Sequence, residues 1–261
     1  MPFRIVELSS ARNPLLQNVR VSAASGRPTS DGLFVIEGPH LLQEVIRSHW
    51  QLETLLFTPE TFVAWEPYAR EHGVETIIVS ARTFSSLATT ETTQGVMALA
   101  RPRVWEWRDF QVHPALLVVL DGVQDPGNAG TIIRSAEAFG ATGAVLLEHS
   151  ARISNGKLMR ASAWSLFRLP VRDAVPPPEF VSRAHEHNWC LAALNPAGSI
   201  AISRFSFKED CALMVGSEGR GVSQELLAHA ASVTIPISRV ESLNAATACS
   251  IALYEASCQR R

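Results

Sequence analysis

The sequence predicts an α/β protein whose C-terminal part is built on a mostly parallel sheet. One observation is the continuous apolar run Ala115–Leu120, which is typical of a strand buried on both faces of such a sheet. The other is that further apolar runs alternate with segments of helical periodicity, as in sheets covered by helices. The expected strands are Ala115–Leu120, Ala144–Leu147, Cys190–Leu194, Ala212–Val215 and Val233–Ile237, and the expected helices include Ile132–Phe139, Leu158–Leu166 and Leu243–Cys258.

A smaller α/β domain is predicted in the first half. Leu41, Leu42, Val45 and Ile46 recur on one helical face between two short apolar runs. The stretch 101–114 is rich in Pro and Trp and is expected to be a linker. The predicted organisation is a domain over residues 1–100, a linker over 101–114 and a domain over 115–261. Strands of the first domain are expected at Leu33–Ile36, Leu55–Thr58, Thr76–Val79 and Gln94–Ala100.

Composition excludes some classes of protein. Of 261 residues, 46% are hydrophobic and 18% charged, which excludes intrinsic disorder. The 23 Lys and Arg face 25 Asp and Glu, so binding of nucleic acid by bulk charge is excluded, whereas local basic patches are not. Only two basic residues are Lys. Arg favours bidentate phosphate contacts, although a GC-rich genome explains this bias equally well.

Cysteine and histidine usage gives no sign of a metal or disulfide framework. The four cysteines show no paired spacing and are interpreted as buried thiols in a reducing cytosol. His185 and His187 would point to different sides of a helix. The apolar runs are too short to span a bilayer, and the N-terminus lacks a signal-peptide core. We therefore expect a cytoplasmic protein with no metal and no membrane partner.

Ligands of parallel sheets lie beyond the carboxyl ends of the strands, so the loops there are the candidate sites. The first loop follows Asp121 and contains Asn128 and Arg134, six residues apart around a helix start. Such a Gly-rich loop could cradle a phosphate, or it could be a tight turn with an Asn cap.

The second and third loops follow later strands. Gly216–Gly221 is not the dinucleotide fingerprint, because Gln224 stands where a third glycine is needed. Its Glu218 could interact with a helix dipole or act at a site. In the third loop, capping explains Ser242 alone, but not Glu241, Ser242 and Asn244 together.

With these three loops in order, the chain resembles the SpoU-type, or TrmH-like, RNA ribose 2′-O-methyltransferases of the SPOUT superfamily. The resemblance runs from about Arg12 to the end. Its motifs are Asn128–Arg134 with Ser135–Gly140, Val215–Ser223, and Ile235–Asn244 continuing into Ile251–Glu255. Weaker signals, Phe34–Gly38 and Gln94–Ala98, resemble the substrate-binding domain that precedes many such catalytic domains.

The resemblance implies a trefoil knot in the C-terminal domain, S-adenosyl-L-methionine as methyl donor, a homodimer, and structured RNA as substrate, with ribosomal RNA favoured over transfer RNA. The residues that it implies for donor binding are Gly216, Ile235, Leu243, Asn195 and Ser217. The residues that it implies for catalysis are Arg134, Asn128, Glu218, Ser242 and Asn244.

In similar enzymes Arg134 is sometimes regarded as the base that removes the 2′ proton. A guanidinium stays protonated in proteins. Our hypothesis is that Arg134 orients the phosphate and ribose and stabilises the developing oxyanion, while the other four hold it and the nucleotide.

RNA contacts are expected from local basic residues. The first 30 residues form a basic arm, and a run without acids extends from Arg152 to Arg172, which could also be a solvated helix face. The expected RNA-binding residues are Arg12, Arg20, Arg27, Arg152, Lys157 and Arg160.

Two other classes of protein compete with this interpretation. One is a non-catalytic RNA-binding or ribosome-assembly factor that keeps the fold but has lost the donor pocket. The other is a dinucleotide-dependent Rossmann enzyme, which the missing fingerprint disfavours.

Overall fold

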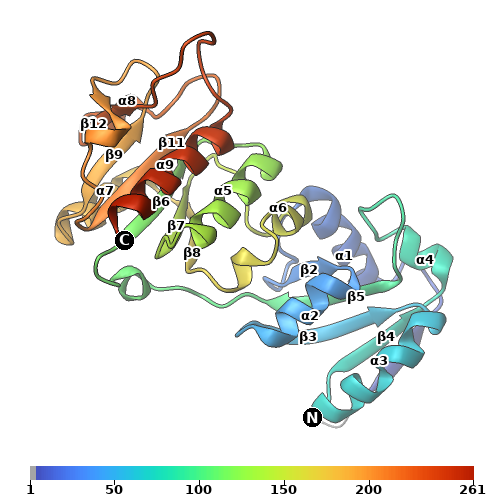
Figure 1. Cartoon of the computed structure of the whole chain (residues 1–261). Helices are drawn as coiled ribbons and strands as arrows, with labels where there is room; N and C mark the ends of the chain where they lie inside the picture. Colours follow the sequence, from blue (N-terminus) through green and yellow to red (C-terminus); the bar gives the residue numbers. More distant parts are fainter. Residues whose placement is uncertain (1–3) are drawn as a thin grey trace. The chain divides into compact units, whose positions relative to one another are not determined.

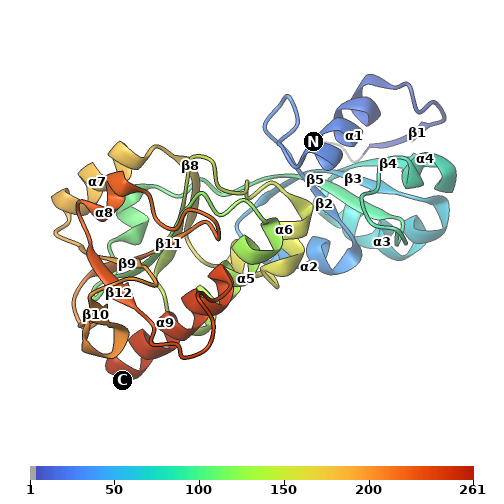
Figure 2. The same cartoon turned by 90° about the horizontal axis from the view of Figure 1, so that it is seen from above.

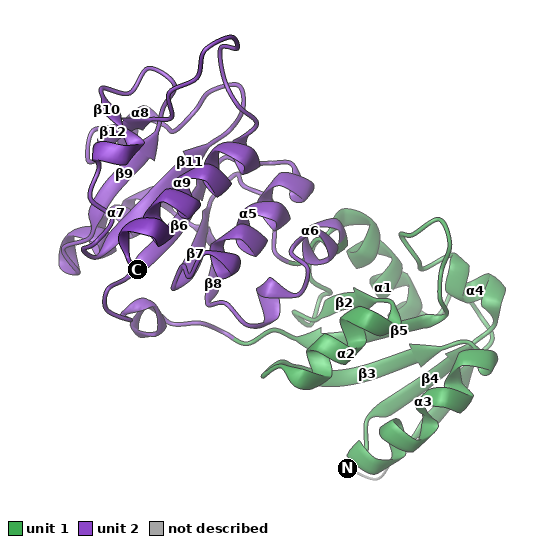
Figure 3. Ribbon diagram, viewed as in Figure 1, with its two compact units in different colours: residues 1–103, 154–156 green, residues 104–153, 157–261 purple. Residues whose placement is uncertain are grey.

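The computed structural model describes residues 4–261 and divides the chain into two compact units. Unit 1 comprises the residues up to 103 together with 154–156, and unit 2 comprises 104–153 and 157–261. Figure 1 shows the whole chain and Figure 3 shows the two units in different colours. Each unit has its own sheet and its own hydrophobic core.

Unit 1 is a five-stranded mixed sheet in the order β1-β4-β3-β5-β2. β1, β4 and β3 are parallel, and β5 runs antiparallel to both β3 and β2. The predicted strands and the helix with Leu41 and Val45 are present. The elements are β1 (Ile5–Leu8), α1 (Pro14–Ser25), β2 (Phe34–Glu37), α2 (Pro39–Arg47), β3 (Gln51–Phe57), α3 (Pro59–His72), β4 (Glu75–Val79), α4 (Ala81–Ser85) and β5 (Val96–Arg101).

The N-terminal segment is not the basic arm that we expected. It forms the edge strand β1 and helix α1, whose Leu16 and Val19 are buried in the core of unit 1. The helix starts where Asn13 accepts a hydrogen bond from the Leu15 N–H, with Pro14 in the first turn. These are ordinary helix-start signals. The sequence analysis did not predict this helix, because polar residues are frequent in the segment.

A buried carboxylate ties β2 to the loop before β5. Glu37 accepts hydrogen bonds from the backbone N–H and hydroxyl groups of both Thr89 and Thr90. Burial raises the pKa of Glu37, but these hydrogen bonds outweigh burial and lower the pKa below its usual value. The charged carboxylate is therefore the form that holds the loop.

Unit 2 contains a seven-stranded parallel sheet in the order β10-β12-β9-β11-β6-β7-β8. Helices α5 and α9 cover one face, and α7 and α8 lie on the other (Figure 2). This agrees with the predicted fold class. The elements are η1 (Trp107–Phe110), β6 (Leu116–Asp121), α5 (Pro126–Ala138), β7 (Gly143–Leu147), α6 (Gly156–Ala161), η2 (Ser165–Phe167), β8 (Val171–Val175), α7 (Pro177–Glu186), β9 (Cys190–Leu194), β10 (Ile200–Ala201), η3 (Ile202–Arg204), β11 (Cys211–Gly216), α8 (Gln224–Leu227), β12 (Ala231–Thr234) and α9 (Ala245–Gln259).

Two predicted elements of unit 2 differ in extent. The strand expected at Val233–Ile237 ends at Thr234, since Pro236 cannot donate to a sheet ladder. The helix expected at Leu158–Leu166 ends at Ala161, because Ala163 and Trp164 have positive φ angles. The trefoil knot implied by the family resemblance stays a prediction.

The stretch expected to be a linker contributes to the core of unit 2. Trp107 and Phe110 of η1 are buried against Phe180 and Trp189. Arg172 lies over the Trp107 ring, with its guanidinium carbon 4.8 Å from the ring centroid. Trp107 is thus a packing residue of this core.

The cysteine interpretation is wrong for two residues. Cys190 and Cys258 are exposed: Cys190 is the first residue of β9, and Cys258 lies on the outward face of α9. Cys211 and Cys249 are buried, and burial raises the pKa of the Cys211 thiol to about 11. Within residues 4–261 no group of three or more His, Cys, Asp and Glu side chains could hold a metal. No helix in that range is long and apolar enough to cross a membrane.

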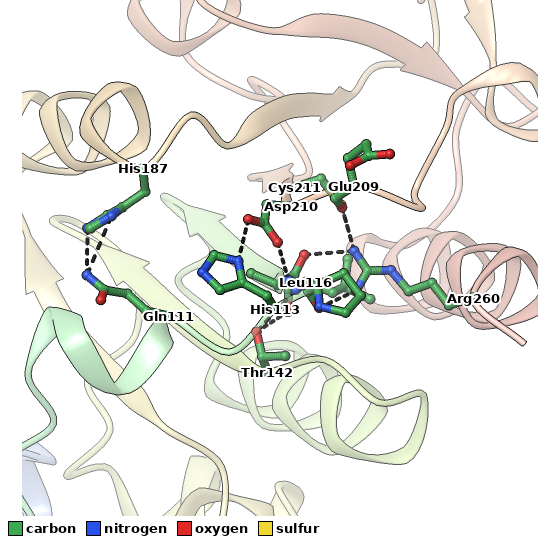
Figure 4. Close-up of polar contacts among 11 residues, drawn as sticks. Gln111, His113, Leu116, Thr142, His187, Glu209, Asp210, Cys211 and Arg260 are labelled. Atoms are coloured by element: carbon green, nitrogen blue, oxygen red, sulfur yellow. Dashed lines mark hydrogen bonds and ion pairs between the residues drawn. The ribbon is translucent and has the colours of Figure 1, made fainter.

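One arginine fastens the end of the chain to the amino ends of two strands (Figure 4). The Arg260 guanidinium donates to the carbonyl oxygens of Phe207, Pro114, Ala115 and Glu209, at 2.6–2.7 Å. The Ala115 carbonyl also accepts from the backbone N–H of Cys211, at the start of β11. Arg260 therefore joins α9 to the segments that enter β6 and β11.

We predict that Arg260→Ala lowers the free energy of unfolding of unit 2 by about 2–4 kcal/mol, because four carbonyl groups lose a charged donor. Calorimetric melting of the full chain measures this. Arg261→Ala is the matched control, because Arg261 is exposed and lies next in the chain. Equal melting of the two variants would show that the Arg260 contacts do not stabilise the fold.

Candidate active site

The three loops singled out in the sequence leave the same edge of the unit 2 sheet. β11 lies beside β6, and Gly216, its last residue, pairs with Asp121, the last residue of β6. The turn after β11 therefore starts beside the loop that leads into α5. β12 is parallel to β9, which is parallel to β11, so the loop from β12 to α9 leaves this edge too. Sheet pairing thus gathers loops that are far apart in sequence.

Asn128, Glu218 and Asn244, one from each loop, form a hydrogen-bonded cluster. Asn128 Nδ2 donates to Glu218 Oε1 at 2.9 Å, and Asn244 Nδ2 donates to the same oxygen at 2.7 Å. Asn244 Nδ2 also lies 3.1 Å from Asn128 Oδ1. The carboxylate oxygen thereby holds two amides that are 116 positions apart in the chain.

The helix caps remove two of the alternatives left open by the sequence. Asp125, and not Asn128, caps α5: its Oδ1 accepts the Asn128 N–H at 2.8 Å. This bond and the Lys157 ammonium lower the pKa of Asp125. Glu218 precedes α8 by several residues, so it does not serve the dipole of that helix. Neither the Asn128 side chain nor the Glu218 side chain caps a helix.

Asn244 does two things at once. It is the N-cap of α9, and its Oδ1 accepts from the N–H groups of Ala246 and Thr247 at 3.0 and 3.2 Å. With Oδ1 committed to the helix, Nδ2 points at Glu218. The first turn of α9 therefore orients a side chain of the cluster, and the cap is Asn244, not Ser242.

A tight turn follows β11 and forms one wall of a cavity. The Ser217 carbonyl accepts the Gly221 N–H at 2.8 Å, which folds the turn back onto Gly216. A Cβ at Gly216 would lie 1.8 Å from the carbonyl carbon of Gly221. Only glycine fits there. Ser223 N–H donates to Asp121 at 2.7 Å and fastens the end of the turn to β6.

The cavity has a volume of about 300 Å³. All five residues expected at the donor site line it, as do two of the residues expected to be catalytic. Ile235 and Leu243 give it apolar walls, while the 216–221 turn presents backbone. Glu218 lies at both the cavity and the cluster. The expected residues in its lining are Asn195, Gly216, Ser217, Glu218, Ile235, Ser242 and Leu243.

Other lining residues escaped the sequence analysis. Leu194 and Pro196 come from the end of β9, and Ile237 comes from the loop after β12. Asn195 is held by the Val233 carbonyl and by Ser232. The motif signal could have included Ile237, but nothing in the sequence shows that β9 lies between β11 and β12.

Arg134 is not brought into this cavity. It is exposed on α5, six residues beyond Asn128, and does not line the cavity. Six helical residues correspond to a rise of about 9 Å and a rotation of about 120° relative to Asn128. Within one chain, the structure separates Arg134 from the other four expected catalytic residues.

The basic run from Arg152 to Arg172 is not an uninterrupted basic surface. Tertiary structure brings acids to it: Asp173 pairs with Arg152 at 3.0 Å, and Asp125 pairs with Lys157 at 3.1 Å. Arg168 and Arg172 likewise pair with Glu137 and Glu179. Arg160 is exposed and has no acidic partner within residues 4–261. Of the residues expected to bind RNA in unit 1, Arg12, Arg20 and Arg27 are exposed on or beside α1.

Fold and motifs together place the chain in the class of RNA methyltransferases. Residues 115–254 match the SpoU rRNA Methylase family, and residues 27–98 match the MRM3-like substrate binding domain. The chain belongs to the SpoU rRNA methylase family. This confirms the resemblance seen in the sequence and removes the dinucleotide-dependent alternative.

Relatives and solved structures agree along nearly the whole chain. The 23S rRNA (guanosine(2553)-2′-O)-methyltransferase RlmP of Bacillus subtilis is 31% identical over 95% of this chain and 98% of its own. The crystal structure of an AdoMet-bound rRNA methyltransferase from Sinorhizobium meliloti has a TM-score of 0.84 at 28% identity, over 97% of each chain. AviRb from Streptomyces viridochromogenes, in complex with AdoMet, has a TM-score of 0.83 at 26% identity, over 95% of this chain and 98% of its own.

We predict that Gly216→Ala destabilises unit 2 by about 3 kcal/mol, because the added Cβ overlaps the backbone of Gly221. Chemical denaturation measures the change. Gly219→Ala is the matched control in the same turn, since a Cβ there meets nothing within 4 Å. A Gly216→Ala variant as stable as Gly219→Ala would mean that the turn is not built on this close approach.

Proposed function

We propose that this protein transfers a methyl group from S-adenosyl-L-methionine to a ribose 2′-hydroxyl of ribosomal RNA. The observation that carries the proposal is the cavity beside β11 that opens at Glu218 onto the Asn128–Asn244 cluster. RlmP, which acts on 23S rRNA, and the two AdoMet-bound structures support it. The match of residues 27–98 to a substrate binding domain favours a large structured RNA.

The residues of the cavity fit the donor. Its apolar walls, Ile235 and Leu243, suit an adenine ring. The bare backbone at Gly216 lets a ligand approach the turn without meeting a side chain. Asn195 and Ser217 add polar groups to the lining. When bound there, S-adenosylmethionine supplies an electrophilic methyl group.

The acceptor side needs orientation and charge stabilisation. Methyl transfer to oxygen needs a nearly linear approach, so positioning supplies much of the rate. Asn128 and Asn244 are locked by Glu218, which gives the acceptor a rigid polar surface. As the oxygen–methyl bond forms, the sulfur–methyl bond of the donor would break, S-adenosylhomocysteine would leave and the hydroxyl proton would pass to water. The negative charge that develops on the oxygen needs a cation nearby. Arg134 is our candidate for that cation.

A homodimer would bring Arg134 to a cavity. Arg134 lies on the exposed side of α5, which packs beside α9 through Ser135 and Ser250, 2.8 Å apart. On α9, Ile251 is 39% and Tyr254 55% exposed. We propose that this α5–α9 face joins two copies, so that Arg134 of one subunit serves the cavity of the other.

Deletion of the gene, followed by mapping of 2′-O-methyl groups across total RNA, is expected to reveal one ribosomal site that loses its methyl group. Purified protein is expected to bind S-adenosylmethionine in a calorimetric titration. Complementation with the wild-type gene is the control and restores the methyl group. A missing methyl group in transfer RNA would contradict the ribosomal assignment, and absence of donor binding would favour the non-catalytic RNA-binding factor.

Mixing two inactive variants tests the shared site. Arg134→Ala and Asn244→Ala each damage one part of it, so each pure dimer is expected to lose most methylation activity. After subunit exchange, mixed dimers carry one site with both groups intact, and activity returns to about a quarter of wild type in a symmetric dimer. Methyl transfer from labelled donor to rRNA measures the recovery.

Arg134→Lys is the matched variant for the role of the guanidinium. It keeps the charge but loses the bidentate fork. Full activity in Arg134→Lys would contradict the orienting role. No recovery in mixed dimers, with exchange verified, would place Arg134 at the cavity of its own chain or outside the reaction.

A further inference from the structure

Two cysteines lie side by side at the amino ends of β9 and β11. Cys190 is the first residue of β9, Cys211 is the first residue of β11, and the two are direct partners in the parallel ladder. The Cys190 N–H donates to the Asp210 carbonyl at 2.9 Å, so the two segments are joined at this point. Neighbouring strands lie about 4.8 Å apart, and this spacing falls within the range of Cα separations that a disulfide spans.

Both cysteine side chains point to the same face of the sheet. The next pair in the ladder, Leu191 and Ala212, belongs to the hydrophobic core on the side of α7 and α8. Because successive side chains of a strand alternate between the two faces, Cys190 and Cys211 point to the opposite face, the one that α9 covers. The two sulfur atoms can therefore meet without a change in strand register.

The two thiols differ in accessibility. Cys190 is exposed, whereas Cys211 is fully buried. Burial raises the pKa of Cys211 to about 11, although the Arg260 guanidinium, whose Nη2 lies 3.5 Å from the sulfur, favours the thiolate. Cys190 is thus the thiol that a dissolved oxidant reaches, and Cys211 reacts only through Cys190.

The other two cysteines, Cys249 and Cys258, do not form such a pair. They lie nine residues apart on α9, which corresponds to a rise of about 13.5 Å. This separation is too large for a disulfide. Cys249 is also fully buried, and Cys258 is exposed on the outward face of the helix. Cys258 therefore provides a matched control, because it is an exposed thiol that does not face a cysteine across a strand pair.

We propose that Cys190 and Cys211 are a peroxide-sensitive pair that forms a reversible disulfide between β9 and β11. The Cys190 thiolate attacks one oxygen of hydrogen peroxide, the O–O bond breaks, hydroxide leaves, and Cys190 becomes a sulfenic acid. The Cys211 thiolate then attacks that sulfur, and the S–O bond breaks with loss of a second hydroxide. The two thiol protons convert both hydroxides to water. The thiols together lose two electrons, which the peroxide gains.

The disulfide closes the segment 190–211, in which Asn195 and Pro196 line the cavity beside β11. It also joins the two strands next to the Ala115 and Glu209 carbonyls that Arg260 holds. A small thiol such as glutathione reverses the bond by exchange. Disulfides in reducing compartments are usually transient and redox-sensing, which suits a pair with one exposed member. The pair takes no part in the proposed methyl transfer, so this inference is independent of that function.

Oxidation of the reduced full chain with stoichiometric hydrogen peroxide tests the pair. Wild-type protein is expected to give a cross-linked peptide that joins Cys190 to Cys211 in mass spectrometry, and dithiothreitol is expected to remove the cross-link. Cys190→Ser is expected to leave Cys211 reduced, because the oxidant does not reach a buried thiol. Cys211→Ser is expected to stop at a sulfenic acid on Cys190, which dimedone traps. The control, Cys258→Ser, is expected to form the cross-link as wild type does.

Melting of the oxidised protein gives a second readout. Closing a loop of about 20 residues is expected to raise the melting temperature of unit 2 by about 5–10 °C. Dithiothreitol is expected to reverse the shift. The same oxidation of Cys190→Ser is expected to leave the melting temperature unchanged, because the bond cannot form.

Three results would overturn the inference. In the first, wild-type Cys190 remains a sulfenic acid or joins only a second copy of the chain. In the second, Cys211 is oxidised as readily in Cys190→Ser as in wild type. In the third, the cross-linked protein melts no higher than the reduced protein. Donor binding and methylation are measured on the reduced protein, so failure of this inference is distinguishable from failure of the proposed function.

Discussion

The parallel pairing of β11 with β6 is the constraint on which the site depends. It sets Gly216 beside Asp121 and so starts two loops at one point of the sheet edge. The loop into α5 then supplies Asn128, and the turn after β11 supplies Glu218. Hydrogen bonds along β6 and β11 also join the segments that Arg260 holds at the opposite end. The pairing of β6 with β11 therefore connects the Arg260 contacts at one end of these strands with the candidate site at the other end.

Local structure and function are combined in the same residues at this edge. Asn244 ends the third loop by capping α9, and the geometry of the cap aims its amide at Glu218. Gly216 allows the turn to close and leaves a bare backbone wall for the cavity. In such sites a substitution alters fold and chemistry together. Matched variants such as Gly219→Ala are needed to separate the two.

Basic residues that stand without acidic neighbours in the sequence are mostly paired with acids in the structure. The run from Arg152 to Arg172 contains no acid, yet most of its cations are paired with acids that folding brings in, such as Asp173 and Glu137. Within the run, Arg160 is the exception: it is exposed and has no acidic partner among the residues that the structure describes. With a net charge of −2, selective contacts at a few arginines suit a structured RNA better than a general basic surface.

The sequence by itself determined the fold class, most strands and the family, because apolar runs, helical periodicity and ordered motifs are local properties. Through the family resemblance it also named seven of the residues that line the cavity. Only the tertiary structure decided that β9 lies next to β11, that α1 is packed into the core of unit 1, and that Arg134 is separated from Asn128. Strand order, ion-pair partners and helix rotation depend on contacts between distant segments, which no local pattern encodes.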